Sequence, residues 1–188
     1  MRAKFKRKFL RAPLRTSALY LMENSAHKGV ITNISEGGLL MESLSFAPTI
    51  NAMPLIFPVL NLPEFSSLGP EILLNLSLDQ FERRVIRMRA RIVRSFDGLS
   101  DIDKIFTNNI GCEFVNSPEK ELLIIRGYIS RYAKNLIYLL SLFESASQKE
   151  DQNRLIRKVA ELLGYDNNLK RNHLRLKALH NYQSLEYL

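Results

Sequence analysis

The sequence predicts a mainly β protein with an α-helical addition: a small antiparallel six-stranded β-barrel followed by a C-terminal helical extension. Short apolar runs separated by turn residues fill most of residues 13–117, which is typical of hairpin-connected strands. Across residues 118–188 apolar side chains recur at helical spacing. Residues 1–12 carry a run of positive charge, and their apolar residues follow neither the helical nor the strand period. We expect a flexible basic arm there.

The first three strands are expected close together in the sequence. Residues 17–22 and 28–34 are rich in strand-forming side chains, and a turn-prone stretch at 23–25 separates them. Two glycines at 37–38 end the second run, and residues 39–41 resume as a third strand. The chain therefore opens with hairpins.

Prolines mark the next segment. Residues 45–70 contain five prolines among apolar residues, which opposes both a regular helix and a central strand, so we expect an elaborated loop or edge insertion. Periodicity returns at 71–78 and at 85–95, and the second run, in which arginines alternate with apolar residues, predicts a long half-exposed strand. A turn starting at 96–98 and a last strand at 108–115 complete the predicted barrel.

The helical extension begins at Ser117. A serine N-cap, a proline in the first turn and nearby acidic residues predict the start of a long helix. Its apolar residues form a heptad-like seam: Leu122, Ile125, Ile129, Tyr132, Leu136, Leu139 and Phe143. The seam either packs on the chain's own later helices or pairs with a second copy of the chain through the helix that starts near Pro118. Intramolecular packing is favoured, because two later amphipathic helices are available to cover it.

Those later helices are expected at 152–163, with Gly164 as the stop, and at about 167–187. The inward residues of the last helix are expected to be Leu169, Leu176, Leu179 and Leu185.

The composition indicates a globular protein with an anionic partner. The chain of 188 residues is 46% apolar, enough for a core, and carries a formal net charge of +8. This charge favours nucleotides, nucleic acid or anionic lipid head groups. No run approaches the length of a membrane span, and the basic N-terminus lacks the apolar stretch of a signal peptide. We therefore expect a cytoplasmic protein without a membrane span.

Neither catalytic residues nor a metal site are predicted. The three histidines, His27, His173 and His180, lie in different contexts, and Cys112 is the only cysteine. The chain has no nucleophile motif and no phosphate-binding glycine-rich loop. We therefore expect a protein that is not an enzyme and that has no cofactor.

The most informative feature is a pair of elements near the N-terminus. Arg7 and Arg11 form Arg-x-x-x-Arg within the basic arm, and Asn33, Ser35 and Gly38 form Asn-x-Ser-x-x-Gly farther on. Two guanidinium groups can donate bidentate hydrogen bonds to phosphate or to a purine edge. On a strand, Asn33 and Ser35 share one face, with a glycine just beyond. The combination suits a nucleotide.

Together these elements resemble the PilZ domain, the bacterial receptor module for cyclic di-GMP, and every defined position of the family pattern is filled. The resemblance covers roughly residues 5–118. It includes an arm around Phe9, a late barrel strand at 90–94 and a closing Gly-x-x-Phe strand at 110–114. The C-terminal third of the chain lies outside it.

The resemblance implies that Arg7 and Arg11 close over cyclic di-GMP and donate to its phosphates and to the O6/N7 edge of guanine. It also implies polar contacts from Asn33 and Ser35 to the other guanine edges or to the backbone of the arm. Gly38 would leave room for a base.

Two further basic residues bear on the implied site. Arg15 also forms Arg-x-x-x-Arg with Arg11, and we interpret it as an auxiliary contact. Family members that bind a stacked ligand pair carry an additional arginine where this chain has Lys6, which favours one ligand per site.

The function that the resemblance implies is a receptor that transmits the level of cyclic di-GMP to an unidentified downstream protein by ordering of its N-terminal arm. Two alternatives stay open. One is an interaction adaptor of the same fold with weak or lost nucleotide binding. The other is a nucleic-acid-binding protein that uses the arm and the basic residues Lys170, Arg171, Arg175 and Lys177.

Overall fold

The computed structural model describes residues 9–42, 44, 52–99, 106–145 and 150–186. The chain divides into two compact units. We call the first the barrel unit, built from Arg11–Leu60 and Arg83–Ile129. The second, the helical unit, is built mainly from Asn61–Glu82 and Ser130–Leu188.

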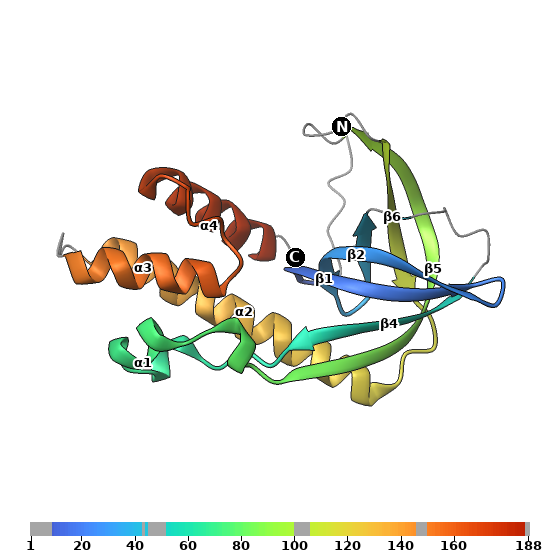
Figure 1. The fold of residues 1–188 in the computed structure, drawn as a ribbon, viewed down its shortest axis with the longest axis horizontal. Coiled ribbons are helices and arrows are strands. Elements are labelled where there is room, and N and C mark those ends of the chain that lie inside the picture. Colours follow the sequence, from blue (N-terminus) through green and yellow to red (C-terminus); the bar gives the residue numbers. More distant parts are fainter. Residues whose placement is uncertain (1–8, 43, 45–51, 100–105, 146–149, 187–188) are drawn as a thin grey trace. The chain divides into compact units, whose positions relative to one another are not determined.

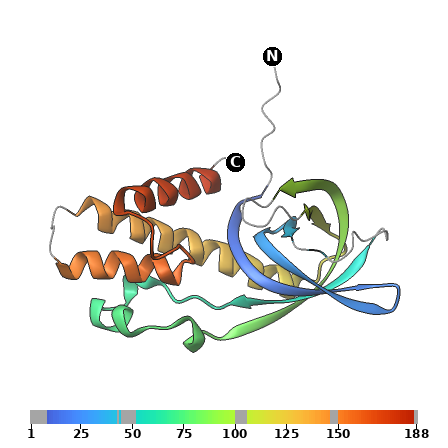
Figure 2. The ribbon, with the colours of Figure 1, turned by 45° about the horizontal axis from the view of Figure 1, so that its top comes forward.

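Antiparallel strands form a closed barrel in the order β1-β2-β3-β6-β5-β4. The strands are β1 (Arg11–Met22), β2 (Ser25–Ser35), β3 (Gly38–Glu42), β4 (Met53–Leu60), β5 (Arg83–Leu99) and β6 (Phe106–Phe114). The long strands curve around a common interior (Figures 1 and 2). The expected antiparallel six-stranded barrel followed by helices is confirmed.

Alternation of inward and outward side chains along the strands explains the interior of the barrel. Inward side chains of β4 and β5 are at most 3% exposed: Met53, Leu55, Phe57, Val59, Ile86, Met88 and Ala90. The residues between them on β5, including Arg87 and Arg89, are exposed, so the predicted half-exposed strand is confirmed. Burying each large apolar side chain contributes about 1.5–3 kcal/mol.

The interpretation of residues 45–70 as a loop or edge insertion is wrong for its central part, because residues 53–60 form β4. Proline is tolerated there because the ladder between β4 and β1 contains only the pairs Leu19↔Ile56 and Tyr20↔Leu55. Alternation of buried and outward residues then decides in favour of a strand. Residues 45–51 lie outside the described part of the chain.

Two other sequence boundaries also differ. Residues 71–78, which show renewed periodicity, contain most of the short helix α1 (Pro70–Asn75), which begins with a proline in its first turn. The expected turn at 96–98 is still strand, because β5 pairs with β6 as far as Leu99↔Phe106.

Helix α2 (Glu119–Glu144) is the long helix that Ser117 predicts. Five residues of its seam are buried: Ile125, Ile129, Tyr132, Leu136 and Leu139. The chain itself covers these five residues. The first part of α2, to Ile129, belongs to the barrel unit and the rest belongs to the helical unit.

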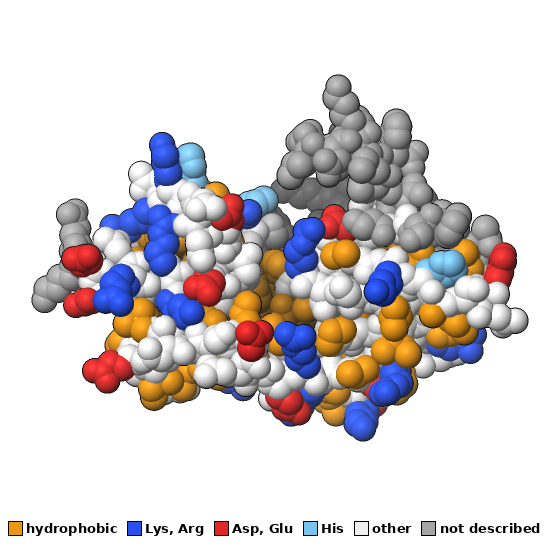
Figure 3. All heavy atoms as spheres, in the orientation of Figure 1, with side chains coloured by type: hydrophobic (Ala, Val, Ile, Leu, Met, Phe, Trp, Pro, Cys, Tyr) orange, Lys and Arg blue, Asp and Glu red, His pale blue; other side chains and the backbone are white. Residues whose placement is uncertain are grey.

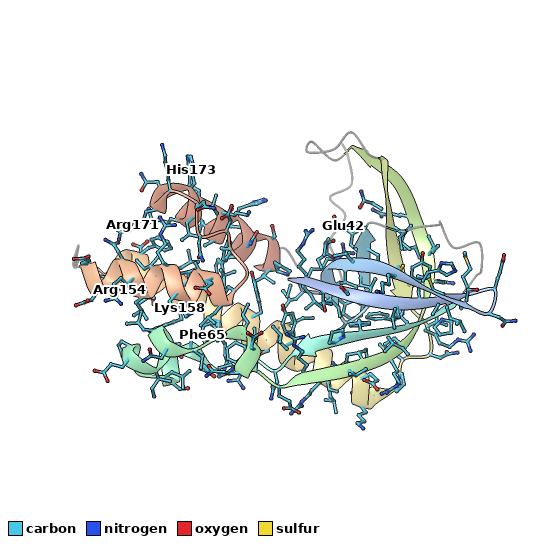
Figure 4. All side chains as sticks on the ribbon, in the orientation of Figure 1. Glu42, Phe65, Arg154, Lys158, Arg171 and His173 are labelled. Atoms are coloured by element: carbon cyan, nitrogen blue, oxygen red, sulfur yellow. The ribbon has the colours of Figure 1, made fainter. Side chains whose placement is uncertain are left out.

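Residues 61–82, which follow β4, fold with the second part of α2 around a buried asparagine. Asn135 is fully buried; its Oδ1 accepts a hydrogen bond from the Phe65 N–H (2.8 Å) and its Nδ2 donates to the Pro63 carbonyl (2.9 Å). Phe65, labelled in Figure 4, is itself fully buried in a short 3-10 turn, Phe65–Ser67. One α2 side chain therefore satisfies two backbone groups of a segment distant in sequence.

An ion pair cluster lies next to this bridge. The Glu64 carboxylate accepts from Arg131 (2.9 Å) and from Lys134 (3.0 Å), both on α2. The Lys134 hydrogen bond is the main reason that the pKa of Glu64 lies below its ordinary value. Because the cluster is solvent-exposed, it orients the segment more than it stabilises it.

The last two helices are α3 (Glu150–Leu162) and α4 (Arg171–Glu186). Gly164 adopts φ +82°, which confirms it as the stop of α3. For α4, Leu185 is buried as expected, but Leu176 and Leu179 are exposed, and the inward residues nearer its start are Leu174 and Ala178. The expected inward set was therefore partly wrong.

Candidate functional site

The described site residues gather at one end of the first hairpin. Arg11 is the first residue of β1, Asn33 and Ser35 lie at the end of β2, and Gly38 begins β3. Arg7 lies outside the described residues. The strand register then decides which of these positions become neighbours.

Pairing of β1 with β2 places Arg11 opposite Ser35 and Pro13 opposite Asn33. Neighbouring strands lie about 4.8 Å apart, so the Arg11 backbone is one strand spacing from Ser35, and Asn33 is its diagonal neighbour two residues along β2. A register shift follows between Pro13 and Thr16, a bulge of the kind that changes strand direction near functional sites. The register thus joins the two sequence elements, with the exposed Arg11 side chain at their edge.

Ser35 has a structural role in the turn that follows β2. It is only 4% exposed, and its hydroxyl donates a hydrogen bond to the Gly38 carbonyl (3.0 Å). The hydroxyl oxygen keeps its acceptor capacity. Ser35 therefore holds the loop from which the remaining motif residues project.

Asn33 presents an unsatisfied acceptor. Its Oδ1 is buried and has no hydrogen-bond partner among the residues that the structure describes. Leaving such a group without a donor costs roughly 1–3 kcal/mol, and natural proteins retain few of them without a reason. An N–H donor from outside the described residues would remove this cost.

Gly38 is required by strand packing. A Cβ at this position would lie 2.0 Å from the Cys112 carbonyl oxygen on β6, a distance that no side chain can adopt without moving the strand. The close approach of β3 and β6 therefore accounts for the glycine before any ligand is considered. Cys112 is buried, and burial raises the pKa of its thiol to about 12, which leaves it unreactive.

Helix α2 is fastened to the motif turn by residues that sequence reasoning did not identify. Arg126 pairs with Glu36, inside the motif, at 2.7 Å, and with Glu119 at 2.6 Å. The Tyr128 hydroxyl donates to the Pro13 carbonyl at 2.6 Å, and desolvation raises the pKa of this buried tyrosine. About ninety residues separate Glu36 from Arg126 along the chain, so no local pattern could reveal this contact.

The auxiliary candidate, Arg15, already has a partner. Its guanidinium lies 3.2 Å from the carboxylate of Glu42 on β3, which Figure 4 labels. The Arg15 side chain is nonetheless 78% exposed, so this pair is weak and free to exchange. A phosphate could compete with Glu42 for the same guanidinium.

Metal and membrane features are not found in the described part of the chain. Its histidines, cysteine and carboxylates form no group of three or more that could hold a metal ion. None of the helices described there is long and apolar enough to cross a membrane.

Comparison with known proteins gives distant similarity in structure alone. No family model and no curated protein matches the chain. Among solved structures, the inhibitor of motility MotI/DgrA of Bacillus subtilis is 16% identical, with a TM-score of 0.47, and the match covers 67% of this chain but only 50% of the other.

Two further matches carry cyclic di-GMP. The PilZ domain of YcgR from Escherichia coli is 16% identical, with a TM-score of 0.43, over 66% of this chain and 89% of the other. The PlzA protein of Borreliella burgdorferi is 13% identical, with a TM-score of 0.40, over 74% of this chain and 54% of the other. Solved PilZ domains are thus among the structures that this chain resembles, while its own strand order establishes the barrel.

Proposed function

We propose that the chain is a cyclic di-GMP receptor that passes the level of this second messenger to a protein partner. The observation that carries the proposal is the Oδ1 of Asn33, which is buried without a partner among the described residues, on the strand that pairs with β1 and Arg11. The Watson–Crick edge of guanine offers N–H donors, which are what this oxygen lacks. The sequence pattern that resembles the PilZ motif includes the same asparagine.

The arginines supply the complementary contacts. Arg11 leaves the barrel edge as an exposed side chain opposite Ser35, and Arg7 lies one Arg-x-x-x-Arg spacing earlier. Guanidinium groups donate bidentately to phosphate and to the O6/N7 edge of guanine. In this proposal the two arginines hold the ligand from the arm, and Asn33 reads a base from the barrel.

Binding is coupled to a local rearrangement. Because Asn33 Oδ1 is buried, a guanine reaches it only if the groups that cover this oxygen move. The arm carries Arg7 and Arg11, so we infer that it changes its arrangement when the ligand enters. The ligand drives this change only to the extent that it binds the closed arrangement better.

Helix α2 offers a route for the signal within the barrel unit. Glu36, in the motif turn, pairs with Arg126, and Pro13, opposite Asn33, accepts from Tyr128. A ligand that shifts the turn therefore changes contacts with α2. We infer that the downstream protein recognises this altered arrangement.

Isothermal titration with cyclic di-GMP at physiological salt tests the proposal. Wild-type protein is expected to bind in the low-micromolar range or tighter, and an Arg7→Ala/Arg11→Ala variant is expected to lose at least 100-fold, about 2.7 kcal/mol. Arg154→Ala/Lys177→Ala removes the same charge from α3 and α4 and is expected to bind as the wild type does.

GTP serves as the ligand control, and it is expected to compete poorly because it lacks the second guanine. Equal losses of affinity in the two double variants would mean that the binding depends only on the net charge of the protein. Absence of heat and of competition at high ligand would refute the receptor and leave the adaptor alternative in its place.

A further inference from the structure

The outer wall of the barrel carries an apolar strip that lies apart from the proposed ligand site. Large aliphatic side chains on three neighbouring strands are well exposed: Leu19 and Leu21 on β1, Ile56 on β4 and Val85 on β5, each between 43% and 45%. Register pairing puts Leu19 beside Ile56. We call this surface the β1-β4-β5 wall.

Cations flank the strip on both sides. Ile56 pairs with Arg87 of β5 on one side, and Leu19 pairs with Lys28 of β2 on the far side of β1. The four residues Lys28, Leu19, Ile56 and Arg87 therefore form one row across four strands. Three strand spacings give this row a length of about 14 Å. Figure 3 shows apolar and basic side chains interspersed over this part of the barrel.

Arg87 and Arg89 form no ion pair with an acidic residue in the described structure. Arg89 pairs in register with Pro54, Arg87 pairs with Ile56, and β4 contains no charged residue. The next outward arginine, Arg91, differs because Glu113 neutralises it at 2.7 Å. Arg87 and Arg89 are thus positive charges beside apolar surface rather than members of an ion-pair network.

Such a combination is typical of a protein interface. Arginine is enriched at interface centres, where its stem packs on apolar groups and its fork binds carboxylates. A contiguous group of exposed large aliphatic residues is unusual on a surface that remains in water.

Nucleic acid and membrane fit the wall less well. Nucleic-acid platforms stack bases on aromatic rings, whereas the exposed large side chains of the wall are aliphatic. Membrane-inserting surfaces place apolar residues beyond the charged ones. In the wall the apolar residues lie between the cations, and the nearby β1-β2 turn carries Glu23, an exposed acid.

We propose that the β1-β4-β5 wall docks an acidic amphipathic segment of a partner protein. The apolar face of the segment covers Leu19 and Ile56, and its carboxylates pair with Lys28 at one end and with Arg87 and Arg89 at the other. On one face of a helix, residues seven or eleven positions apart are separated by about 10.5 or 16.5 Å, which brackets the length of the row. The segment thus has about two or three turns between its acidic ends.

A displayed library of random peptides about 16 residues long, which as a helix spans about 24 Å, tests the proposal with the full chain as bait. Peptides selected on the wild type are expected to combine Asp or Glu with Leu, Ile or Val. Synthetic copies are expected to bind Arg87→Glu/Arg89→Glu at least tenfold more weakly in a fluorescence anisotropy titration. Arg154→Glu/Lys177→Glu, which changes the net charge equally, is expected to bind as the wild type does.

A second variant separates docking from folding. Ile56→Ser keeps every charge and removes apolar surface, and it is expected to weaken the same peptides while its thermal melting and its cyclic di-GMP binding stay close to wild type. Equal loss in both charge variants, or selection of peptides without acidic and aliphatic residues, overturns the proposal. So does binding to phosphatidylserine vesicles or to RNA that depends on Arg87 and Arg89 when peptide binding does not.

Discussion

The barrel unit and the helical unit are stabilised by different kinds of contact. In the barrel, backbone ladders between neighbouring strands support an apolar interior, and charged side chains such as Arg87 and Arg89 face outward. In the helical unit, the side chain of one α2 residue, Asn135, satisfies two buried backbone groups of residues 61–82. Single polar substitutions should therefore matter more in the helical unit, and backbone crowding should matter more in the barrel.

The largest effect is expected for Asn135→Leu. The substitution leaves the Phe65 N–H and the Pro63 carbonyl without their buried partner, which costs about 1–3 kcal/mol for each group. We expect the free energy of unfolding of the helical unit to fall by about 3–5 kcal/mol in urea denaturation followed by circular dichroism. Asn172→Leu makes the same chemical change at an exposed position of α4 and should alter it by no more than about 0.5 kcal/mol. Equal effects at the two sites would contradict the role given to Asn135.

The next largest effect is expected for Gly38→Ala in the barrel. The new methyl would lie 2.0 Å from the Cys112 carbonyl, so β3 and β6 must separate, at a cost of about 2–3 kcal/mol. Gly127→Ala is the matched change in α2, where a Cβ meets nothing within 4 Å, and it should stabilise by about 0.5–1 kcal/mol. Urea denaturation without ligand measures both. If Gly38→Ala leaves the free energy of unfolding unchanged, strand packing does not require this glycine.

The same contrast explains which parts of the fold could be read from the sequence. Alternation along β5 and the signals at Ser117 and Gly164 are local, and they predicted a strand, a helix start and a helix stop correctly. The prediction of a loop or edge insertion at 45–70 was wrong for β4, because the tolerance of proline in that strand depends on how little of it pairs with β1. The prediction that Leu176 faces inward was wrong, because the buried face of α4 depends on the placement of the elements that pack against it.

The candidate site divides in the same way. The turn at 23–25 predicted that residues 17–22 pair with 28–34, but the pairing of Arg11 with Ser35 lies beyond the register shift between Pro13 and Thr16, which the turn does not determine. The sequence could not indicate that Asn33 lacks a donor, nor that Arg126 of α2 pairs with Glu36. Both depend on contacts between segments that come together only in the folded chain.

Asn33→Leu should separate stability from binding at the site. Because Asn33 Oδ1 is buried without a partner, replacing it by an apolar group of similar size should raise the free energy of unfolding by about 1 kcal/mol. Cyclic di-GMP binding should nevertheless be lost in isothermal titration. Ser35→Ala provides the contrast, since it removes a satisfied hydrogen bond to Gly38 and should lower stability by about 1 kcal/mol. A destabilised Asn33→Leu protein would show that the oxygen has a partner in solution.

A smaller effect is expected for the pair between Arg126 and Glu36. Both side chains are partly exposed, so the coupling energy from a double-mutant cycle of Arg126→Gln and Glu36→Gln should stay below about 1 kcal/mol. It should fall further at 1 M salt, where the screening length is about 3 Å. If the receptor proposal is correct, Arg126→Gln should bind cyclic di-GMP with nearly the wild-type affinity. The change in hydrogen exchange of α2 that ligand addition causes should, however, differ from the change in the wild type. An unchanged exchange response would remove α2 from the signalling route.

The smallest effect is expected for Glu64→Gln in the helical unit. The pH dependence of the difference in stability between wild type and variant distinguishes this effect from the others. The hydrogen bond from Lys134, reinforced by Arg131, lowers the folded-state pKa of Glu64 below its unfolded value. The carboxylate therefore adds stability above the unfolded glutamate pKa of about 4.3, and the contribution disappears as pH falls through the lower folded pKa. Wild type should melt slightly above Glu64→Gln at neutral pH, and the two melting temperatures should converge under acid. A difference that widens as the pH falls would mean that Glu64 is held in its protonated form, and the ion pairs with α2 would then contribute nothing to the helical unit.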